Sequence, residues 1–286
     1  MLVFGGSRST GLAWDIAKAM KAETGKTEIK SFPDGEKYVK ILSGAKGSEC
    51  AVVQSVRSND DLVELMLLLD TLRDMGATQV HAVMPYLAYM RQDRIFSEGE
   101  ALSAKTVLKI LDEISDSLST VNCHFLSDGG EAVFNHIRLM NIDAIPSLAR
   151  YIGTKVKNPI FVAPDKGSLG FAKAGAEILD CEFDHLSKTR HSGSEVSIEM
   201  KDLYVKGHDV IVLDDIISTG GTIVESAKVI RKGRPASINV GCVHGLFLSG
   251  IDQFKGTCDR LVSTNSMDNP VSKVSIADII AKDLLR

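Results

Sequence analysis

The sequence has no long apolar stretch and almost no excess of charge of one sign. Its longest apolar runs are far shorter than the roughly 20 residues that a membrane-spanning helix needs, so no membrane partner is expected. The 33 basic and 37 acidic residues give a net charge of −4, which does not favour a nucleic-acid-binding surface. The first residues also lack the charged and apolar regions of a signal peptide.

Cysteine is scarce and scattered. There are five cysteines, and no two of them form a Cys-x-x-Cys pair. An odd number without such spacing excludes a zinc site or a disulfide framework of the usual kinds. The pattern predicts reduced, mostly buried thiols and therefore a cytoplasmic protein. These residues are Cys50, Cys123, Cys181, Cys242 and Cys258.

What the sequence does have is a regular alternation of short β-branched runs and helical patterns. This alternation is typical of α/β folds with mainly parallel sheets flanked by helices. The chain of 286 residues is long enough for two such domains. We expect strands at 2–4, 50–56, 79–84, 159–163, 209–213 and 237–243, and helices at 60–74 and 222–231.

The two halves of the chain also match each other at a nearly constant spacing. Gly11 corresponds to Gly170, and Val52-Val53 corresponds to Ile211-Val212, both at an offset of 159 residues. Several matches in one order predict two copies of one α/β unit. We therefore expect an N-terminal domain at 1–145 and a C-terminal domain at 146–273. The final segment, 274–286, is expected to form a helix whose packing partner the sequence leaves open.

The segment 212–222 carries the clearest chemical signal. An apolar run ends in Asp214 and Asp215, and a turn rich in hydroxyls and glycine then leads into a helical pattern. Glycines let backbone N–H groups face an anion, and the helix start adds a favourable dipole. The acids can hold a hydrated Mg²⁺ or accept hydrogen bonds from sugar hydroxyls. The segment predicts a sugar-phosphate site whose phosphate cradle consists of Ser218, Thr219, Gly220, Gly221 and Thr222.

The two acids alone would more often cap the next helix, and it is the Ser-Thr-Gly-Gly-Thr sequence after them that favours a binding site. The first copy differs at the equivalent place. There Ser55-Val56 stand in place of the acid pair, and the segment 55–61 lacks both glycines. Only the C-terminal copy is therefore expected to have kept the cradle.

Other motifs allow two interpretations each when taken alone. Residues 32–36, Phe-Pro-Asp-Gly-Glu, form either a simple turn or a stacking face with acceptors for a base. Residues 90–94 are either a solvated surface or, through their arginines, forked donors for a polyphosphate. His124 at a strand end is either structural or a ligand. Asp165 is either a helix cap or a metal ligand.

Lys188 and Arg190 lie two residues apart in a polar segment between two strand patterns. In an extended loop this spacing places both cations on one side. Such a loop either forms an exposed basic hairpin tip or closes over an anionic transition state.

Together and in this order, these segments resemble the ribose-phosphate pyrophosphokinases (phosphoribosyl pyrophosphate synthetases) along nearly the whole chain. The cradle alone would match any type I phosphoribosyltransferase, whereas the Arg-Gln-Asp and Lys-x-Arg elements narrow the resemblance to the synthetases. The matching stretches are 32–36, 91–94, 99–105, 123–124, 164–165, 188–190, 212–222 and 243–247.

The resemblance implies two tandem phosphoribosyltransferase-like domains of type I and a diphosphokinase activity. The β,γ-diphosphoryl group of ATP would pass to the C1 hydroxyl of ribose 5-phosphate, with Mg²⁺ as cofactor and AMP as the second product. Family roles imply that Phe32, Asp34, Glu36, Arg91, Gln92 and His124 bind ATP. They imply that Arg190, Asp214, Asp215, Ser218, Thr219, Gly220, Gly221 and Thr222 bind ribose 5-phosphate.

The remaining implied roles concern the metal and the transferred group. His124 and Asp165 would lie near Mg²⁺, and Lys188 and Arg190 would be the catalytic residues that stabilise the transferring phosphoryl group. The adenine contacts would come from a neighbouring subunit, so a homo-oligomer built from dimers is implied. The alternatives are a phosphoribosyltransferase, which would use the same cradle, and a non-catalytic regulatory protein that associates with a synthetase.

Overall fold

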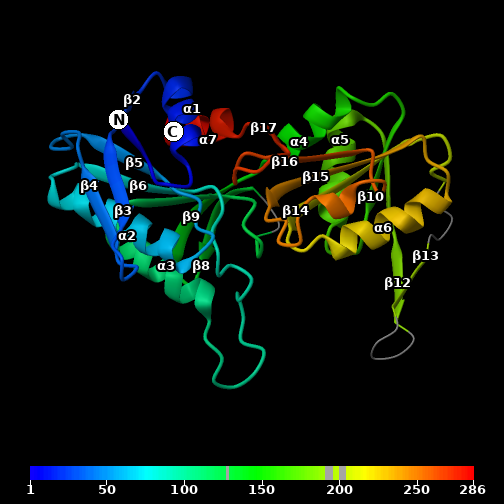
Figure 1. Ribbon diagram of the computed structural model, residues 1–286, viewed down its shortest axis with the longest axis horizontal. Helices are drawn as coiled ribbons and strands as arrows, with labels where there is room; N and C mark the ends of the chain where they lie inside the picture. The colour runs from blue at the N-terminus through cyan, green and yellow to red at the C-terminus, as the bar shows by residue number, and fades with distance from the viewer. Residues whose placement is uncertain (127–128, 191–195, 200–203) are drawn as a thin grey trace. The chain divides into compact units, whose positions relative to one another are not determined.

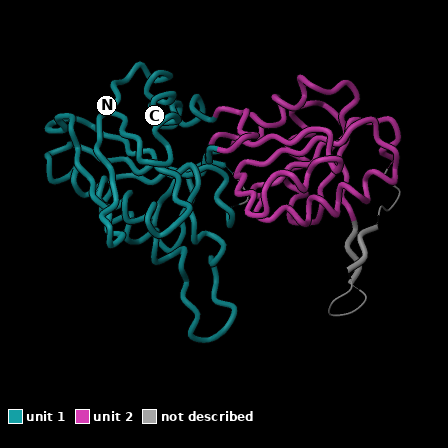
Figure 2. Tube along the Cα trace, viewed as in Figure 1, with its two compact units in different colours: residues 1–143, 266–268, 276–286 teal, residues 144–265, 269–275 magenta. Residues whose placement is uncertain are grey.

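The computed structural model describes residues 1–126, 129–190, 196–199 and 204–286 and divides the chain into two compact units (Figure 2). The N-terminal unit comprises residues 1–143, 266–268 and 276–286, and the C-terminal unit comprises residues 144–265 and 269–275. The chain therefore leaves the first unit after Asp143 and returns to it near its end. Among the described residues, no helix is both long and apolar enough to cross a bilayer.

The N-terminal unit is built on a seven-stranded sheet in the order β2-β1-β5-β6-β7-β9-β8 (Figure 1). All neighbouring strands are parallel except β8 and β9. A separate antiparallel hairpin joins β3 to β4. The strands are β1 (Leu2–Gly5), β2 (Glu23–Thr24), β3 (Thr27–Ser31), β4 (Lys37–Ile41), β5 (Glu49–Val53), β6 (Gln79–Met84), β7 (Ser117–Val121), β8 (Gly130–Phe134) and β9 (Ile137–Ile142).

Helices cover both sides of this sheet, with α1 and α7 on one side and α2 and α3 on the other (Figure 1). The last helix, whose partner the sequence left open, packs against α1 within the N-terminal unit. The helices are α1 (Thr10–Met20), α2 (Asn59–Asp74), α3 (Ser103–Ile114) and α7 (Ala277–Leu284).

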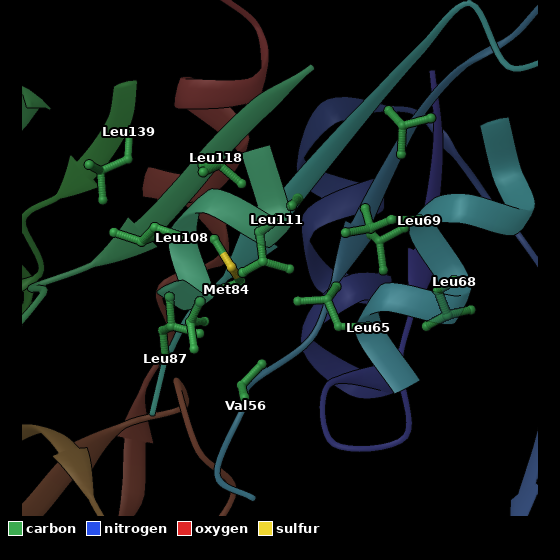
Figure 3. Packing of buried hydrophobic residues seen from close by; sticks show 14 of the residues in the cluster. Val56, Leu65, Leu68, Leu69, Met84, Leu87, Leu108, Leu111, Leu118 and Leu139 are labelled. Carbon is green, nitrogen blue, oxygen red and sulfur yellow. The ribbon is translucent and has the colours of Figure 1, made fainter. Parts of the chain in front are cut away.

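Helix α2 shows how local sequence and packing combine. It begins at a capping box, in which Ser58 accepts from the amide of Asp61 and Asp61 accepts from the amide of Ser58. Its leucines at helical spacing are buried and pack against α3 and the sheet, as Figure 3 shows for Leu65, Leu68 and Leu69. These contacts form the main hydrophobic core of the N-terminal unit.

The C-terminal unit repeats the plan with a fully parallel six-stranded sheet in the order β11-β10-β14-β15-β16-β17. Its strands are β10 (Pro159–Ala163), β11 (Glu182–His185), β14 (Asp209–Ile217), β15 (Ser237–Gly245), β16 (Arg260–Thr264) and β17 (Ser272–Val274). Its helices are α4 (Ile145–Gly153), α5 (Leu169–Leu179), α6 (Gly221–Lys232) and the short 3₁₀ helix η1 (Asp252–Phe254). An antiparallel hairpin of β12 (Ser187–Arg190) and β13 (Val196–Glu199) belongs to the same unit.

The predicted α/β architecture and its duplication are confirmed. Strands β2, β1, β5, β6 and β7 have the same order and direction as β11, β10, β14, β15 and β16. In each unit the strand order reverses between the first two long strands, β1 and β5 or β10 and β14. Open α/β sheets bind ligands at this reversal, outside the carboxyl ends of the strands.

Several strand ends differ from the expectation. Strand β5 ends at Val53 and not at 56, and β15 continues to Gly245 and not only to 243. Strand β14 continues past Leu213 to Ile217, because it pairs with β15 along its whole length. Strand β10 pairs with β14 only as far as Ile211. The acids therefore lie inside the strand, in the part that extends beyond β10, and not in the turn after it.

Candidate active site

The reversal point of the C-terminal sheet brings three acids close together. Asp165 follows the end of β10, and Asp214 and Asp215 lie in the extension of β14. The Ser168 hydroxyl lies between two of them, 3.4 Å from Oδ1 of Asp165 and 3.5 Å from Oδ1 of Asp214. Predicted residues from two separate segments are thus joined at one edge of the sheet.

Asp214 has a strongly perturbed pKa. Burial, followed by the charge of Asp215 beside it, raises the pKa of Asp214 to about 8. The amide of Asp215 donates to Oδ1 of Asp214 at 3.0 Å, which partly offsets the cost of ionisation. A group of acids in this state is suited to a cation or to the hydroxyl donors of a sugar.

Asp165 serves its own loop as well. Its Oδ1 accepts from the amides of Gly167 at 3.0 Å and Ser168 at 3.2 Å, just before α5. Asp165 is therefore not the helix cap, because the N-cap of α5 is Ser168; one of its oxygens instead closes the turn before the helix, while its charge also acts on Asp214. In the described part of the chain, no three histidine, cysteine or acidic side chains form a metal-holding cluster. Mg²⁺ usually takes one or two carboxylates plus water and substrate oxygens, so this donor set fits that ion.

The predicted phosphate cradle lies directly after β14. Ser218 and Thr219 lead to Gly220, the N-cap of α6, which has φ +91. A Cβ at this position would lie 2.6 Å from the Phe254 ring, so only glycine fits. The first amides of α6, from Gly221 onward, have no acceptor within the helix and can bind an anion.

A second loop supports the cradle from behind. The amide of Leu248 donates to the Ser218 carbonyl at 2.9 Å, and the Gln253 side chain donates to the Thr219 carbonyl. Because these carbonyl oxygens receive donors from another loop, the turn is held in shape through its carbonyl groups and not through its hydroxyls and amides.

The equivalent place in the N-terminal unit is filled by the chain's own carboxylates. Glu64 on α2 is fully buried and accepts from the Ser7 amide at 2.6 Å, the Ser7 hydroxyl at 2.8 Å and the Gln54 side chain at 2.9 Å. The Lys37 ammonium lies 3.6 Å from the same carboxylate. Glu64 thus uses the donors of the β1 loop that an anionic ligand would need.

Asp61 does the same for the start of α2. It accepts from the amides of Arg57 and Ser58 at 3.0 Å and from the Arg8 guanidinium at 3.1 Å. Burial opposes ionisation of this acid, but these hydrogen bonds outweigh it and hold its pKa below the ordinary value. These contacts give a physical reason for the prediction that only the C-terminal copy has an open cradle.

The residues expected to bind adenine lie at the tip of the β3–β4 hairpin. The turn is closed by the Phe32 amide, which donates to the Glu36 carbonyl at 2.8 Å, and by Gly35 with φ +96. The turn interpretation is thus correct, and the side chains of Phe32, Asp34 and Glu36 are exposed on it. Among the described residues, none of these side chains is hydrogen-bonded to Arg91 or Gln92.

Arg91 and Gln92 lie in the loop between β6 and α3, where Arg91 is exposed and Gln92 is half-buried. His124 is exposed beyond the end of β7. Its neighbours are held in place, because the Cys123 amide donates to the Asn141 side chain at 2.8 Å.

Lys188 and Arg190 both lie in β12, where Lys188 pairs with Ile198 and Arg190 with Val196. Their backbone is extended, as the argument from their spacing assumed. Their side chains, and the segments 191–195 and 200–203 of the same loop, lie outside the described part of the chain.

Comparison with known proteins identifies the family. Residues 1–114 match the model of the N-terminal domain of ribose phosphate pyrophosphokinase, and residues 134–274 match the phosphoribosyl transferase domain. The ribose-phosphate pyrophosphokinase of Methanothermobacter thermautotrophicus is 37% identical over 285 residues, which cover 98% of each chain. The chain belongs to the ribose-phosphate pyrophosphokinase family.

Two further relatives agree with this assignment. The ribose-phosphate pyrophosphokinase of Pyrococcus furiosus is 42% identical, covering 96% of this chain and 97% of its own. The crystal structure of the phosphoribosylpyrophosphate synthetase from Mycobacterium smegmatis has a TM-score of 0.83 at 24% identity, covering 99% of this chain and 97% of that one. This last match shows that the pyrophosphokinase fold is shared.

Sequence reasoning missed several residues of this pyrophosphokinase site. Ser168 could have been noticed, because a serine three residues after Asp165 and at the start of a helical pattern is a common bridging arrangement. Gln253 and Phe254, which support the cradle, had no local signal because they lie more than 30 residues along the chain from Thr219. Glu64 has no local signal either, because its burial results from tertiary packing.

Proposed function

We propose that this chain is a ribose-phosphate diphosphokinase that transfers the β,γ-diphosphoryl group of ATP to the C1 hydroxyl of ribose 5-phosphate. The observation that carries the proposal is the open phosphate cradle beside a buried acid group, in a chain related to pyrophosphokinases over nearly its full length. The products are phosphoribosyl pyrophosphate, a precursor for nucleotide synthesis, and AMP.

The C-terminal unit would bind the sugar phosphate. The amides and hydroxyls of 218–222 donate to the 5-phosphate, and the α6 dipole favours its charge. Asp214 and Asp215 accept from the ribose hydroxyls, directly or through a metal. Because the supporting loop already holds the turn, little ordering is required on binding.

Mg²⁺ would be held near Asp165 and His124 together with substrate oxygens, and when bound it would neutralise charge on the phosphates. The chain itself supplies the carboxylates. Without a cation their negative charges are unfavourable, because burial and the neighbouring acid raise the pKa of Asp214.

The N-terminal unit would bind ATP through Phe32, Asp34, Glu36, Arg91 and Gln92, with the hairpin contributed by a neighbouring subunit. Lys188 and Arg190 would stabilise the charge of the transferring diphosphoryl group, and Arg190 would also contact the sugar phosphate. Phosphoryl transfer asks mainly for positioning and charge neutralisation, which these residue types provide.

A homo-oligomer and a cytoplasmic location remain predictions. The hairpin tip supports the first, because its side chains are exposed and are not bonded to the other proposed nucleotide residues of their own unit. The second rests on the scattered cysteines, all five of which are free thiols.

The nearest rival is a phosphoribosyltransferase, which would bind phosphoribosyl pyrophosphate in the same cradle. Release of AMP from ATP and ribose 5-phosphate, with no base present, distinguishes the two activities. A non-catalytic regulatory relative would give no AMP at all.

Calorimetry tests the proposed sites. Wild-type protein with Mg²⁺ should bind ribose 5-phosphate, and Asp215→Ala should lose that binding about tenfold or more while keeping ATP binding. Equal loss of both ligands would contradict the assignment of Asp215, because it would indicate a general folding defect.

A further inference from the structure

The loop that joins β6 to α3, residues 85–102, is held in shape by one carboxylate. Figure 1 shows this loop extending away from the sheet. Oε2 of Glu100 accepts from the amides of Phe96 at 2.8 Å and Ser97 at 3.1 Å, and from the side-chain amide of Gln92 at 3.4 Å. A single carboxylate oxygen therefore accepts hydrogen bonds from three residues of the loop.

The backbone makes this arrangement possible. Gly99 has φ +86, which turns the chain so that Glu100 faces back into its own loop. The Glu100 amide donates to the Ser97 carbonyl at 3.2 Å. The amide of Ala104, in the first turn of α3, donates to the Gln92 carbonyl at 3.2 Å. The backbone of Gln92 is therefore anchored on α3, and its side chain on Glu100.

These contacts determine which end of the Gln92 side chain can meet a ligand. Its Nε2 group donates to the Arg94 carbonyl at 3.1 Å and to Glu100 at 3.4 Å. Both side-chain donors are used inside the loop, so the group that remains for a ligand is the carbonyl oxygen, an acceptor. On ATP the donors are the amine of the base and the ribose hydroxyls, whereas the phosphate oxygens accept.

The charge of Glu100 strengthens the arrangement. The amides of Phe96 and Ser97 hold the pKa of Glu100 below its ordinary value, so the group is a carboxylate at neutral pH. Hydrogen bonds to an ionised acceptor are about twice as strong as those between neutral groups. Glu98, two residues away on the same exposed loop, serves as a matched control.

We propose that Glu100 is a positioning residue for nucleotide binding, which orients Gln92 so that its carbonyl oxygen meets a donor on the nucleoside part of ATP. The inference rests on the proposed function, because contact between Gln92 and ATP is part of that function. Glu100 itself does not touch the substrate and acts through Gln92.

The kinetics of AMP release distinguish a role in ATP binding from a general role in folding or loop stability. Glu100→Ala should raise KM for ATP about tenfold, while kcat and KM for ribose 5-phosphate change less than about twofold. Glu100→Gln should lie between Glu100→Ala and wild type, because its amide oxygen can still accept. Glu98→Ala should match wild type. An unchanged KM for ATP in Glu100→Ala, or an equal rise for both substrates, overturns the proposal.

ATP analogues test the direction of the contact. With an analogue that lacks the donor contacted by Gln92, Glu100→Ala and wild type should have the same KM. Purine riboside triphosphate removes the amine, and 2′-deoxy-ATP and 3′-deoxy-ATP each remove one hydroxyl. A tenfold penalty that persists with all three analogues overturns the assigned orientation of Gln92.

Amide hydrogen exchange gives a readout that does not depend on activity. In wild type the amides of Phe96 and Ser97 should be protected, and Glu100→Ala should exchange them about tenfold faster or more, with Glu98→Ala unchanged. Equal exchange rates of these two amides in wild type and Glu100→Ala would show that the Glu100 carboxylate does not hold the loop. If wild type releases no AMP, the proposed function fails, and the exchange result still decides whether Glu100 organises the loop.

Discussion

Replacing Glu64 tests whether the chain's own carboxylates fill the N-terminal copy of the site. Glu64→Ala removes the acceptor of the Ser7 amide, the Ser7 hydroxyl and the Gln54 side chain, and it leaves the Lys37 ammonium without its partner at 3.6 Å. Glu64→Gln preserves the shape but removes the charge and one acceptor. Asp70→Ala, at an exposed position on the same helix, is the control.

The size of the effect follows from burial. Gln54 is fully buried, so its unsatisfied amide should cost about 1–3 kcal/mol. Ser7 is exposed, so water can replace part of what its groups lose. With the void left by the side chain, Glu64→Ala should lower the free energy of unfolding by about 3 kcal/mol. Glu64→Gln should cost about 1 kcal/mol, and Asp70→Ala should stay within about 0.5 kcal/mol.

The protein contains its own reporter for this measurement. Trp14, the single tryptophan, lies on α1 in the same unit as Glu64. Urea unfolding followed by tryptophan fluorescence therefore reports on the N-terminal unit. A loss below about 1 kcal/mol in Glu64→Ala would contradict the role of Glu64 as the acceptor of these groups, because it would mean that the buried donors find other acceptors.

Inorganic phosphate extends the same test. If Glu64 stands where an anion would bind, phosphate should stabilise the Glu64→Ala protein more than wild type in the tryptophan-monitored transition. Equal stabilisation of the two proteins would contradict that interpretation of the pocket.

Three further predictions concern the C-terminal site. Gly220→Ala should lower ribose 5-phosphate affinity about tenfold and stability by about 2 kcal/mol, since φ +91 and the Phe254 ring exclude a side chain; Gly170→Ala, at an open helix position, should not lower the urea midpoint followed by circular dichroism. The pKa of Asp214 is 3.8 in the unfolded chain and about 8 in the folded protein. The wild type therefore loses stability as the pH rises from about 4 to about 8. The unfolding free energy of Asp214→Asn minus that of wild type should therefore grow by up to about 1.4 kcal/mol per pH unit and level off above about pH 8; a flat difference would contradict the raised pKa. Lys188→Ala should lower kcat at least about 100-fold with little change in KM for ATP, and an unchanged kcat would remove its catalytic assignment.

Local patterns were enough to predict much of the fold. Strands β6 and β10 have the bounds expected from their apolar runs, because each run ends at a proline and its last three residues are buried on both faces. The cradle was also predictable, since a glycine with positive φ before a helix has a clear local signature.

What local patterns could not predict depends on long-range pairing. Asp214 and Asp215 look like the end of a strand, yet β14 continues because β15 supplies partners as far as Gly245. Tertiary pairing here overrides the weak strand preference of acids. Glu64 is similar, because its burial depends on Ser7, which is 57 residues away in the chain.

In the proposed reaction an intact diphosphoryl group passes from ATP to C1 of ribose 5-phosphate. Phosphorus NMR of a reaction containing only protein, Mg²⁺, ATP and ribose 5-phosphate tests it directly. The products should be AMP and a diphosphate ester on C1 in equal amounts, with the 5-phosphate unchanged. Formation of ADP with a single phosphate on the sugar, or no turnover by folded protein that binds both substrates, would contradict it.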